Sequence, residues 1–232
     1  MIGRASAGAP QDEQSVRIPS GTVELDGILT LPSAARAIVM FAHGSGSSRL
    51  SPRNRFVARS LHEAHLATLL MDLLTAPEEA ADAATAHLRF NIPLLASRLV
   101  AATDWALGEA ATRGLCVGYF GASTGAAAAL VAAGQRPAAV RAIVSRGGRP
   151  DLAGDVLDAV LAPTLLIVGE QDREVLAMNR AALGAIRVEK DLAVVPGAGH
   201  LFEEPGALEE VARLATAWFV RLLTPKPPDT RP

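Results

Sequence analysis

Residues 115–133 read LCVGYFGASTGAAAALVAA, and this stretch decides the fold of the chain. An apolar run typical of a buried strand leads directly into Gly121–Gly125, and an alanine-rich run typical of a helix follows. Ser123 stands at the centre of a G-x-S-x-G motif, whose small residues permit a sharp turn between strand and helix. Such a turn holds the serine hydroxyl above the edge of a sheet. The stretch therefore predicts a strand–turn–helix unit with Ser123 as a candidate nucleophile.

A serine hydroxyl is a weak nucleophile near neutral pH, so this hypothesis requires a base and an orienting acid elsewhere in the chain. The chain order expected for a serine on such a turn is Ser, then Asp or Glu, then His. His200 is the only histidine after Ser123, and it lies in a glycine-rich loop that follows an apolar run. Asp172 follows the apolar run 164–168. All three residues are expected at the carboxyl ends of predicted strands, where open α/β sheets bind ligands.

Each of these residues also has a purely structural interpretation. A serine between glycines occurs in ordinary tight turns, and histidines such as His200 are common in surface loops. Asp172 is placed to cap a helix that begins near Glu174. Glu170 and Glu174 are alternative acids, whereas Asp191 precedes its strand and lies at the wrong end.

Acyl transfer also requires hydrogen-bond donors for the negative charge on the carbonyl oxygen. One donor is expected to be the backbone N–H of Thr124, which follows the nucleophile. The second is expected in the glycine- and serine-rich loop after the apolar strand Ala37–Phe41, where we favour the N–H of Ser45 over that of Gly44. His43 in the same loop is expected to have a structural role through hydrogen bonds within the loop.

Other chemistries fit the sequence less well. The Gly44–Gly46 loop lacks the Lys-Ser/Thr ending of a nucleotide-binding loop and the third glycine of a dinucleotide fingerprint. The single cysteine, Cys116, is predicted to be buried in the middle of a strand. His62 and His65 stand three residues apart, which favours a helix face over a zinc site. The sequence implies neither a metal nor a cofactor.

At these positions the chain resembles the α/β-hydrolase superfamily, and within it the small dienelactone hydrolase-like members that lack a lid. The matching segments lie between about Thr22 and Leu222, and they are the loops at 43–46 and 197–200, the Ser123 turn and the strand end at 169–172. The resemblance implies hydrolysis of a carboxylic ester, lactone or thioester through an acyl-enzyme. Dienelactone hydrolases themselves carry cysteine at the position of Ser123, which favours an ordinary serine esterase. The stretch Ser145–Leu152 is similar to hydrolase domains sometimes fused to phosphoribosyltransferases.

The leading functional hypothesis is a serine hydrolase that cleaves small or short-chain esters or lactones with Ser123, Asp172 and His200. A thioesterase or acyltransferase with the same triad is the alternative within enzymes. A non-catalytic binding module on the hydrolase fold is the alternative from another class. The expected partner is a small-molecule ester, bound by a monomer or a homodimer.

Length and composition set the remaining expectations. A chain of 232 residues, of which half are apolar, is long enough for one well-buried domain. A net charge of −2 with mixed signs gives no reason to expect nucleic acid or a membrane surface as partner. We expect a flexible leader at 1–14, a single α/β-hydrolase domain at 15–224 and a flexible tail at 225–232. The leader lacks the apolar core of a signal peptide, and one cysteine fits a cytoplasmic location.

Short apolar runs alternate with helical patterns along the domain, which predicts an α/β fold with a mostly parallel sheet of about eight strands flanked by helices. The predicted strands are Val16–Ile18, Val23–Leu31, Ala37–Phe41, Thr68–Met71, Leu115–Tyr119, Ala142–Ser145, Thr164–Val168 and Leu192–Val195. The predicted helices are Pro52–Ala64, Pro93–Leu107, Thr124–Ala133, Glu174–Leu183 and Ala207–Leu222. The first two strands are expected to form an antiparallel hairpin at the edge of the sheet. Too few residues separate the sixth and seventh strands for a large lid, so we expect an open pocket with Leu73–Ile92 as one wall.

Arginines are frequent in the loops predicted to follow strands. Their ordinary interpretation is as solvated surface groups and ion pairs. The sharper hypothesis is that Arg53, Arg89 or Arg146 recognises a carboxylate or phosphate on the substrate through paired hydrogen bonds.

Overall fold

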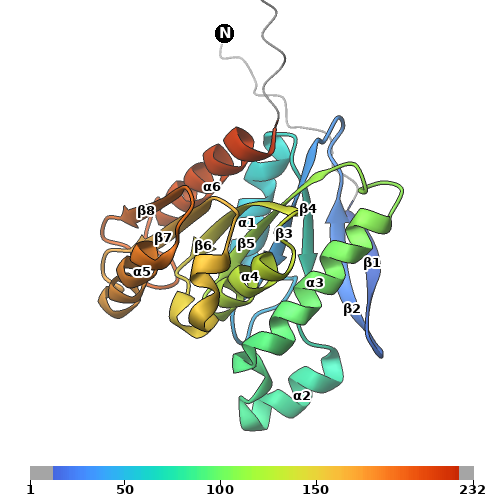
Figure 1. The fold of residues 1–232 in the computed structure, drawn as a ribbon, viewed down its shortest axis with the longest axis horizontal. Coiled ribbons are helices and arrows are strands. Elements are labelled where there is room, and N and C mark those ends of the chain that lie inside the picture. Colours follow the sequence, from blue (N-terminus) through green and yellow to red (C-terminus); the bar gives the residue numbers. More distant parts are fainter. Residues whose placement is uncertain (1–12, 225–232) are drawn as a thin grey trace, which may run out of the picture.

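The computed structural model describes residues 13–224, which form one eight-stranded sheet with helices on both faces (Figure 1). The strand order across the sheet is β1-β2-β4-β3-β5-β6-β7-β8. β2 runs antiparallel to both of its neighbours, and all other neighbouring strands are parallel. The strands are β1 (Glu13–Ser20), β2 (Val23–Thr30), β3 (Ala37–Ala42), β4 (Ala67–Met71), β5 (Cys116–Ala122), β6 (Val140–Arg146), β7 (Thr164–Gly169) and β8 (Lys190–Val195).

The helices form two layers that enclose the sheet (Figure 1). α1 and α6 pack together on one face, over a core that includes Phe41, Phe120 and Phe219. α3, α4 and α5 cover the other face together with η2. The helices are α1 (Pro52–Glu63), α2 (Ala76–Thr85), α3 (Ile92–Gly108), α4 (Thr124–Gln135), α5 (Arg173–Ala185) and α6 (Ala207–Leu223), with 3-10 turns η1 (Leu88–Phe90) and η2 (Pro150–Ala159).

This architecture confirms the predicted α/β-hydrolase fold, the eight strands and the hairpin at the edge of the sheet. β1 begins earlier than predicted, because Glu13 and Gln14, which fall in the predicted leader, pair with Thr30 and Leu29. Residues 1–12 of the predicted leader, and the predicted tail, lie outside the described residues. Cys116 is the half-buried first residue of β5, so the prediction that it is buried in mid-strand is wrong.

α2 was expected only as a short helix within a loop. It has ten residues and begins with a complete capping box, in which the Thr75 hydroxyl accepts from the Glu78 N–H and the Glu78 carboxylate accepts from the Thr75 N–H. The sequence Thr-Ala-Pro-Glu at 75–78 carries this signal, since a threonine three residues before a glutamate is typical of a helix start. The helix thus gives the predicted pocket wall a firm backbone.

The parallel strands bring the candidate site residues to one edge of the sheet. The loop after β3, the Ser123 turn after β5 and the Asp172 turn after β7 all follow the carboxyl ends of their strands. Asp191 lies at the start of β8 and pairs with Leu165 near the start of β7, whereas Asp172 follows the end of β7. The exclusion of Asp191 as the acid therefore agrees with the fold.

Within residues 13–224, none of the helices combines the length and the apolar character needed to cross a lipid bilayer.

A half-buried histidine, His62, makes the stability of the fold depend on pH. The Nε2 atom of His62 in α1 lies 2.6 Å from the Thr68 hydroxyl in β4, and burial lowers the pKa of His62 from 6.5 to about 4. Between these two values the unfolded chain binds more protons than the folded chain, so stability falls as the pH drops from 6.5 towards 4.

We expect His62→Gln, which cannot take up this proton, to lose less stability than the wild type between pH values of about 7 and 4.5. Urea unfolding at both pH values measures the difference. His65→Gln is the matched control, because His65 is an exposed histidine next to the same helix and should leave the pH dependence unchanged. Equal pH dependence of His62→Gln and wild type would contradict the assignment.

Candidate active site

Ser123 occupies the sharp turn between β5 and α4 in a strained backbone conformation. Its φ and ψ angles are 50° and −120°, a region that residues with a side chain rarely adopt. The Ser123 N–H donates to the carbonyl oxygen of Arg146 at 3.2 Å, which ties the turn to the end of β6. Strain of this kind costs about 1–3 kcal/mol and persists where the surrounding structure enforces it. The turn is therefore more than an ordinary loop between two elements.

The glycines of the motif are required by close backbone contacts. A Cβ atom on Gly121 would lie 2.4 Å from the Cα of Ala126. A Cβ atom on Gly125 would lie 2.2 Å from the carbonyl oxygen of Ala42 at the end of β3. Both separations are far below van der Waals contact, so only glycine fits at either position.

Asp172 and His200 form the second part of the site. The Nδ1 atom of His200 lies 2.6 Å from the Oδ2 atom of Asp172. Asp172 stands at the N-cap of α5, yet its side chain makes no capping hydrogen bond, so the carboxylate faces His200 in place of the helix end. With Nδ1–H donating to this carboxylate, Nε2 carries the lone pair that a general base needs. The alternative acid Glu170 accepts from the Gly197 N–H at 2.8 Å and so holds the histidine loop.

Ser123 and His200 flank the same short segment after β6. The Ser123 backbone is hydrogen bonded to Arg146 and Arg149, and the His200 ring packs against Gly147, where a Cβ atom would lie 3.4 Å from the ring Cε1. No hydrogen bond joins the Ser123 hydroxyl to His200 in the described part of the chain. In active sites such bonds commonly tighten only once substrate is bound.

Candidate oxyanion donors surround the serine. A Cβ atom on Gly44 would lie 3.0 Å from the Ser123 Cβ, and the Ser45 hydroxyl lies 3.1 Å from that of Thr124. Across the described residues, neither the Gly44 N–H nor the Ser45 N–H donates a hydrogen bond. The Thr124 N–H opens α4 and has no partner within the helix. Free N–H groups beside a serine suit the oxyanion of acyl transfer.

His43 fixes the loop that carries two of these groups. Its Nε2 accepts from the Leu73 N–H at 3.1 Å, so its Nδ1 bears the proton and donates to the Gly44 carbonyl oxygen at 2.9 Å. Burial lowers the pKa of His43, which keeps the ring neutral. The expected structural role is therefore met, and the ring also links the loop to the end of β4.

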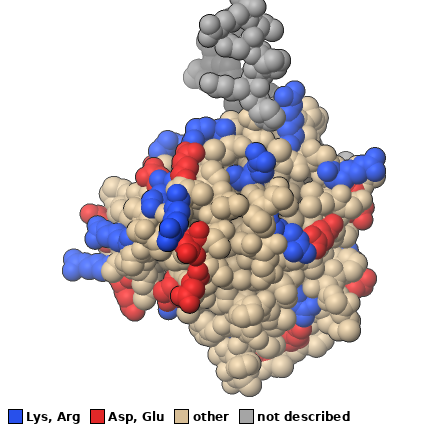
Figure 2. Space-filling view, in the orientation of Figure 1, with Lys and Arg blue, Asp and Glu red and all other residues tan. Residues whose placement is uncertain are grey.

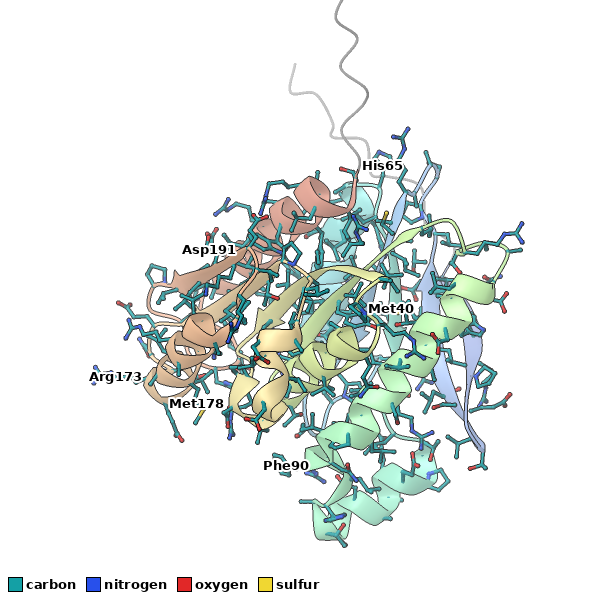
Figure 3. The ribbon with its side chains drawn as sticks, viewed as in Figure 1. Met40, His65, Phe90, Arg173, Met178 and Asp191 are labelled. Carbon is teal, nitrogen blue, oxygen red and sulfur yellow. The ribbon has the colours of Figure 1, made fainter. Side chains whose placement is uncertain are left out.

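A cavity of about 590 Å³ opens beside the candidate oxyanion donors. Ser45 and Thr124 line it at the end near the serine, and Leu74, Glu79 and Asp82 line it from the segment 73–92. The prediction that this segment forms a wall of the pocket is confirmed. Phe90 of η1 projects from the same segment at the lower edge of the molecule (Figure 3).

The three candidate arginines differ in their ion-pair partners. Arg89 and Arg53 both line the cavity, but Arg89 is paired with Asp82 at 2.5 Å and Arg53 with Glu203 at 3.1 Å. Such pairs are common on this protein, and Figure 2 shows basic and acidic side chains side by side over the drawn face. Arg146, in contrast, has no carboxylate within ion-pair distance among residues 13–224.

The two histidines considered as a zinc pair have separate partners, since His62 bonds to Thr68 and His65 to the Ser33 carbonyl. No cluster of three or more metal-ligating side chains occurs in the part of the chain that the structure describes.

The chain was compared with family models and with known proteins. No family model matches it. Two Mycobacterium tuberculosis proteins named "Putative phosphoribosyl transferase", from strains CDC 1551 and H37Rv, are each 56% identical over 216 residues, which cover 93% of this chain and 48% of theirs. The chain thus spans about half the length of the curated relatives it matches.

Solved structures give a fuller match. The structure of a dienelactone hydrolase from Anabaena variabilis is 58% identical, covers 93% of this chain and 100% of its own, and superposes with a TM-score of 0.92. Est1E from Butyrivibrio proteoclasticus, solved with ferulic acid, shares the fold at 17% identity, with a TM-score of 0.76 over 89% of this chain and 98% of its own. The chain therefore belongs to the dienelactone hydrolase family of α/β hydrolases.

Proposed function

We propose that the chain is a serine hydrolase that cleaves small or short-chain carboxylic esters through an acyl-enzyme on Ser123. The observation that carries the proposal is the 2.6 Å hydrogen bond between His200 and Asp172, at the same sheet edge as a serine held in a strained turn. A carboxylate and a histidine joined in this way serve to activate a nucleophile. Family membership supports the same chemistry.

In the proposed reaction, the Ser123 oxygen attacks the ester carbonyl carbon while its proton passes to the Nε2 atom of His200. Asp172 holds the ring in the required tautomer and stabilises its positive charge. The N–H groups of Thr124 and Ser45, or of Gly44 in place of Ser45, receive the negative oxygen. The tetrahedral intermediate then breaks its bond to the alcohol oxygen, which takes the proton from His200. A water molecule, deprotonated by His200, repeats the sequence on the acyl-enzyme and releases the acid.

The surroundings of the site favour small substrates. The cavity of about 590 Å³ mixes serine hydroxyls with leucine side chains, and Leu50 at its lining is 53% exposed. A cavity of this size is typical of sites that bind small molecules. The transferase in the name of the curated relatives has no part in this proposal, since we assign the ester chemistry to the half of those proteins that matches this chain.

The first test is hydrolysis of p-nitrophenyl acetate, butyrate and octanoate by the wild type and two variants. We expect Ser123→Ala to lower kcat by about 10⁴-fold or more and Asp172→Asn by about 10⁴-fold, because each removes one member of a unit that acts together. Acetate and butyrate should be cleaved faster than octanoate.

Ser47→Ala is the matched control, because Ser47 lines the same cavity and has no role in the proposed chemistry. Turnover that survives in Ser123→Ala would refute the acyl-enzyme. Butyryl thioester, assayed in parallel, distinguishes an esterase from the thioesterase alternative.

The second test concerns the loop that His43 holds. Replacing His43 with Ala removes its bonds to Gly44 and Leu73 and frees the loop that supplies a proposed oxyanion donor. We expect kcat for p-nitrophenyl butyrate to fall by about 10²-fold with little change in KM, since the lost contact acts on the transition state. His65→Gln should retain wild-type kinetics. A rise in KM at unchanged kcat would assign the loop to substrate binding instead.

A further inference from the structure

Arg146 is an uncompensated positive charge in the interior, next to the candidate site. The residue is only 8% exposed, and its Nε and Nη1 atoms are buried with no hydrogen-bond partner among the described residues. Its guanidinium lies 5.8 Å from the centre of the Phe202 ring. A buried charge is costly unless an opposite charge or hydrogen-bond acceptors accompany it. This unpaired charge belongs to a residue beside the proposed nucleophile, because the Arg146 carbonyl oxygen accepts a hydrogen bond from the Ser123 N–H.

A second arginine lies close to the first. Arg53 binds Glu203, the residue that follows Phe202, and the Phe202 ring packs against Arg146. Burial chiefly, and the charge of Arg53 in addition, lower the pKa of Arg146 to about 10. The Nε atom of Arg53 is also buried without a partner. Arg53 belongs to the first turn of α1, which contains no acidic residue, so the positive end of this helix adds to the same field. Three buried donor atoms on two guanidinium groups therefore lack an acceptor.

One acidic side chain reaches this pair. Glu203 binds the Nη1 atom of Arg53 at 3.1 Å, and its side chain is 66% exposed. The carboxylate of Glu203 can leave Arg53 at little cost, because an exposed ion pair contributes about 0–1 kcal/mol. Two other carboxylates line the cavity, those of Glu79 and of Asp82, which binds Arg89.

We propose that Arg146 and Arg53 form an anion subsite for a phosphate group on the ester substrate, occupied at rest in part by Glu203. When Glu203 moves away, the Arg53 guanidinium at the cavity is free to bind the ligand, and the buried charge of Arg146 adds to the attraction. A phosphate monoester at neutral pH carries nearly two negative charges and three acceptor oxygens, which matches two guanidinium groups. A carboxylate carries one charge and two oxygens, and Glu203 already supplies that much to Arg53. The subsite rests on the proposed ester hydrolysis for its role in the reaction.

The position of the subsite fits the proposed reaction. Arg53 lines the cavity that contains Ser45 and Thr124, and Phe202, against which Arg146 packs, is two residues from His200. A phosphate held here would lie between the candidate oxyanion donors and the histidine loop. Of the three candidate arginines, Arg53 and Arg146 form the subsite, whereas Arg89 stays paired with Asp82.

The test has a binding arm and a kinetic arm. Inorganic phosphate is titrated into the wild-type protein by calorimetry, with sodium chloride and acetate at matched ionic strength as controls. In the kinetic arm, kcat/KM is compared for p-nitrophenyl esters of phosphonobutyrate, glutarate and hexanoate, which carry a phosphonate, a carboxylate and no charge. We expect phosphate to bind where chloride and acetate do not, and the phosphonate ester to have the highest kcat/KM.

The arginine variants and the Glu203 variant should change phosphate binding in opposite directions. Arg53→Gln and Arg146→Gln should each weaken phosphate binding and lower kcat/KM for the phosphonate ester relative to the neutral ester by about ten- to hundredfold. Glu203→Gln should strengthen phosphate binding by up to about fivefold, since it removes the competing carboxylate. Arg136→Gln removes an exposed arginine that is paired with Asp104, and serves as the control with no expected change.

Three results would overturn the proposal. One is phosphate binding no tighter than chloride binding, and another is an equal effect of both arginine variants on phosphonate and neutral esters. The third is an equal kcat/KM for the glutarate and phosphonate esters, which would show that the subsite binds a singly charged carboxylate as well as a phosphonate. If Arg146→Gln does not fold, Arg53→Gln and Glu203→Gln still decide the outcome. Phosphate binding that depends on Arg53 without any ester turnover would refute the proposed function and leave the subsite intact.

Discussion

The close backbone contact between the Ser123 turn and the end of β3 is the constraint on which the candidate site depends. Because Gly125 has no side chain, α4 can begin directly against the carbonyl oxygens of Ala42 and His43. The same approach brings the loop after β3 onto Ser123 and places the Ser45 hydroxyl 3.1 Å from that of Thr124. The contact between the end of β3 and the start of α4 thus positions both the candidate nucleophile and its candidate oxyanion donors.

The other half of the site is held by hydrogen bonds between loops. The segment after β6 bonds to the backbone of Ser123 and packs against the ring of His200, and Glu170 bonds to the loop that carries this histidine. Asp172 gives up its capping bond to α5 in favour of His200. The strained Ser123 turn and the missing side-chain cap of α5 each lower the stability of the fold locally. Packing of the buried aromatic core against the central strands offsets this loss.

The sequence was most informative where one short pattern determines the structure. The Ser123 turn, the strand ends and the edge hairpin follow from apolar runs and glycine spacing, and so does the chain order of Asp172 and His200. α2 was underestimated because its capping signal is brief and its apolar face is weak. The ion pairs were beyond sequence reasoning, since Arg53 and Glu203 are separated by 150 positions and meet only after folding. For that reason the three candidate arginines looked equivalent in the sequence, whereas in the fold Arg53 and Arg89 have carboxylate partners and Arg146 has none among residues 13–224.

In the proposed site the Ser123 turn presents a nucleophilic serine to an activated histidine. Reaction of the folded protein with a fluorophosphonate, followed by peptide mapping with mass spectrometry, tests this arrangement. We expect one label per chain, on Ser123, with labelling that slows strongly in His200→Ala. Label on another residue, or labelling of Ser123 at the same rate without His200, would contradict it.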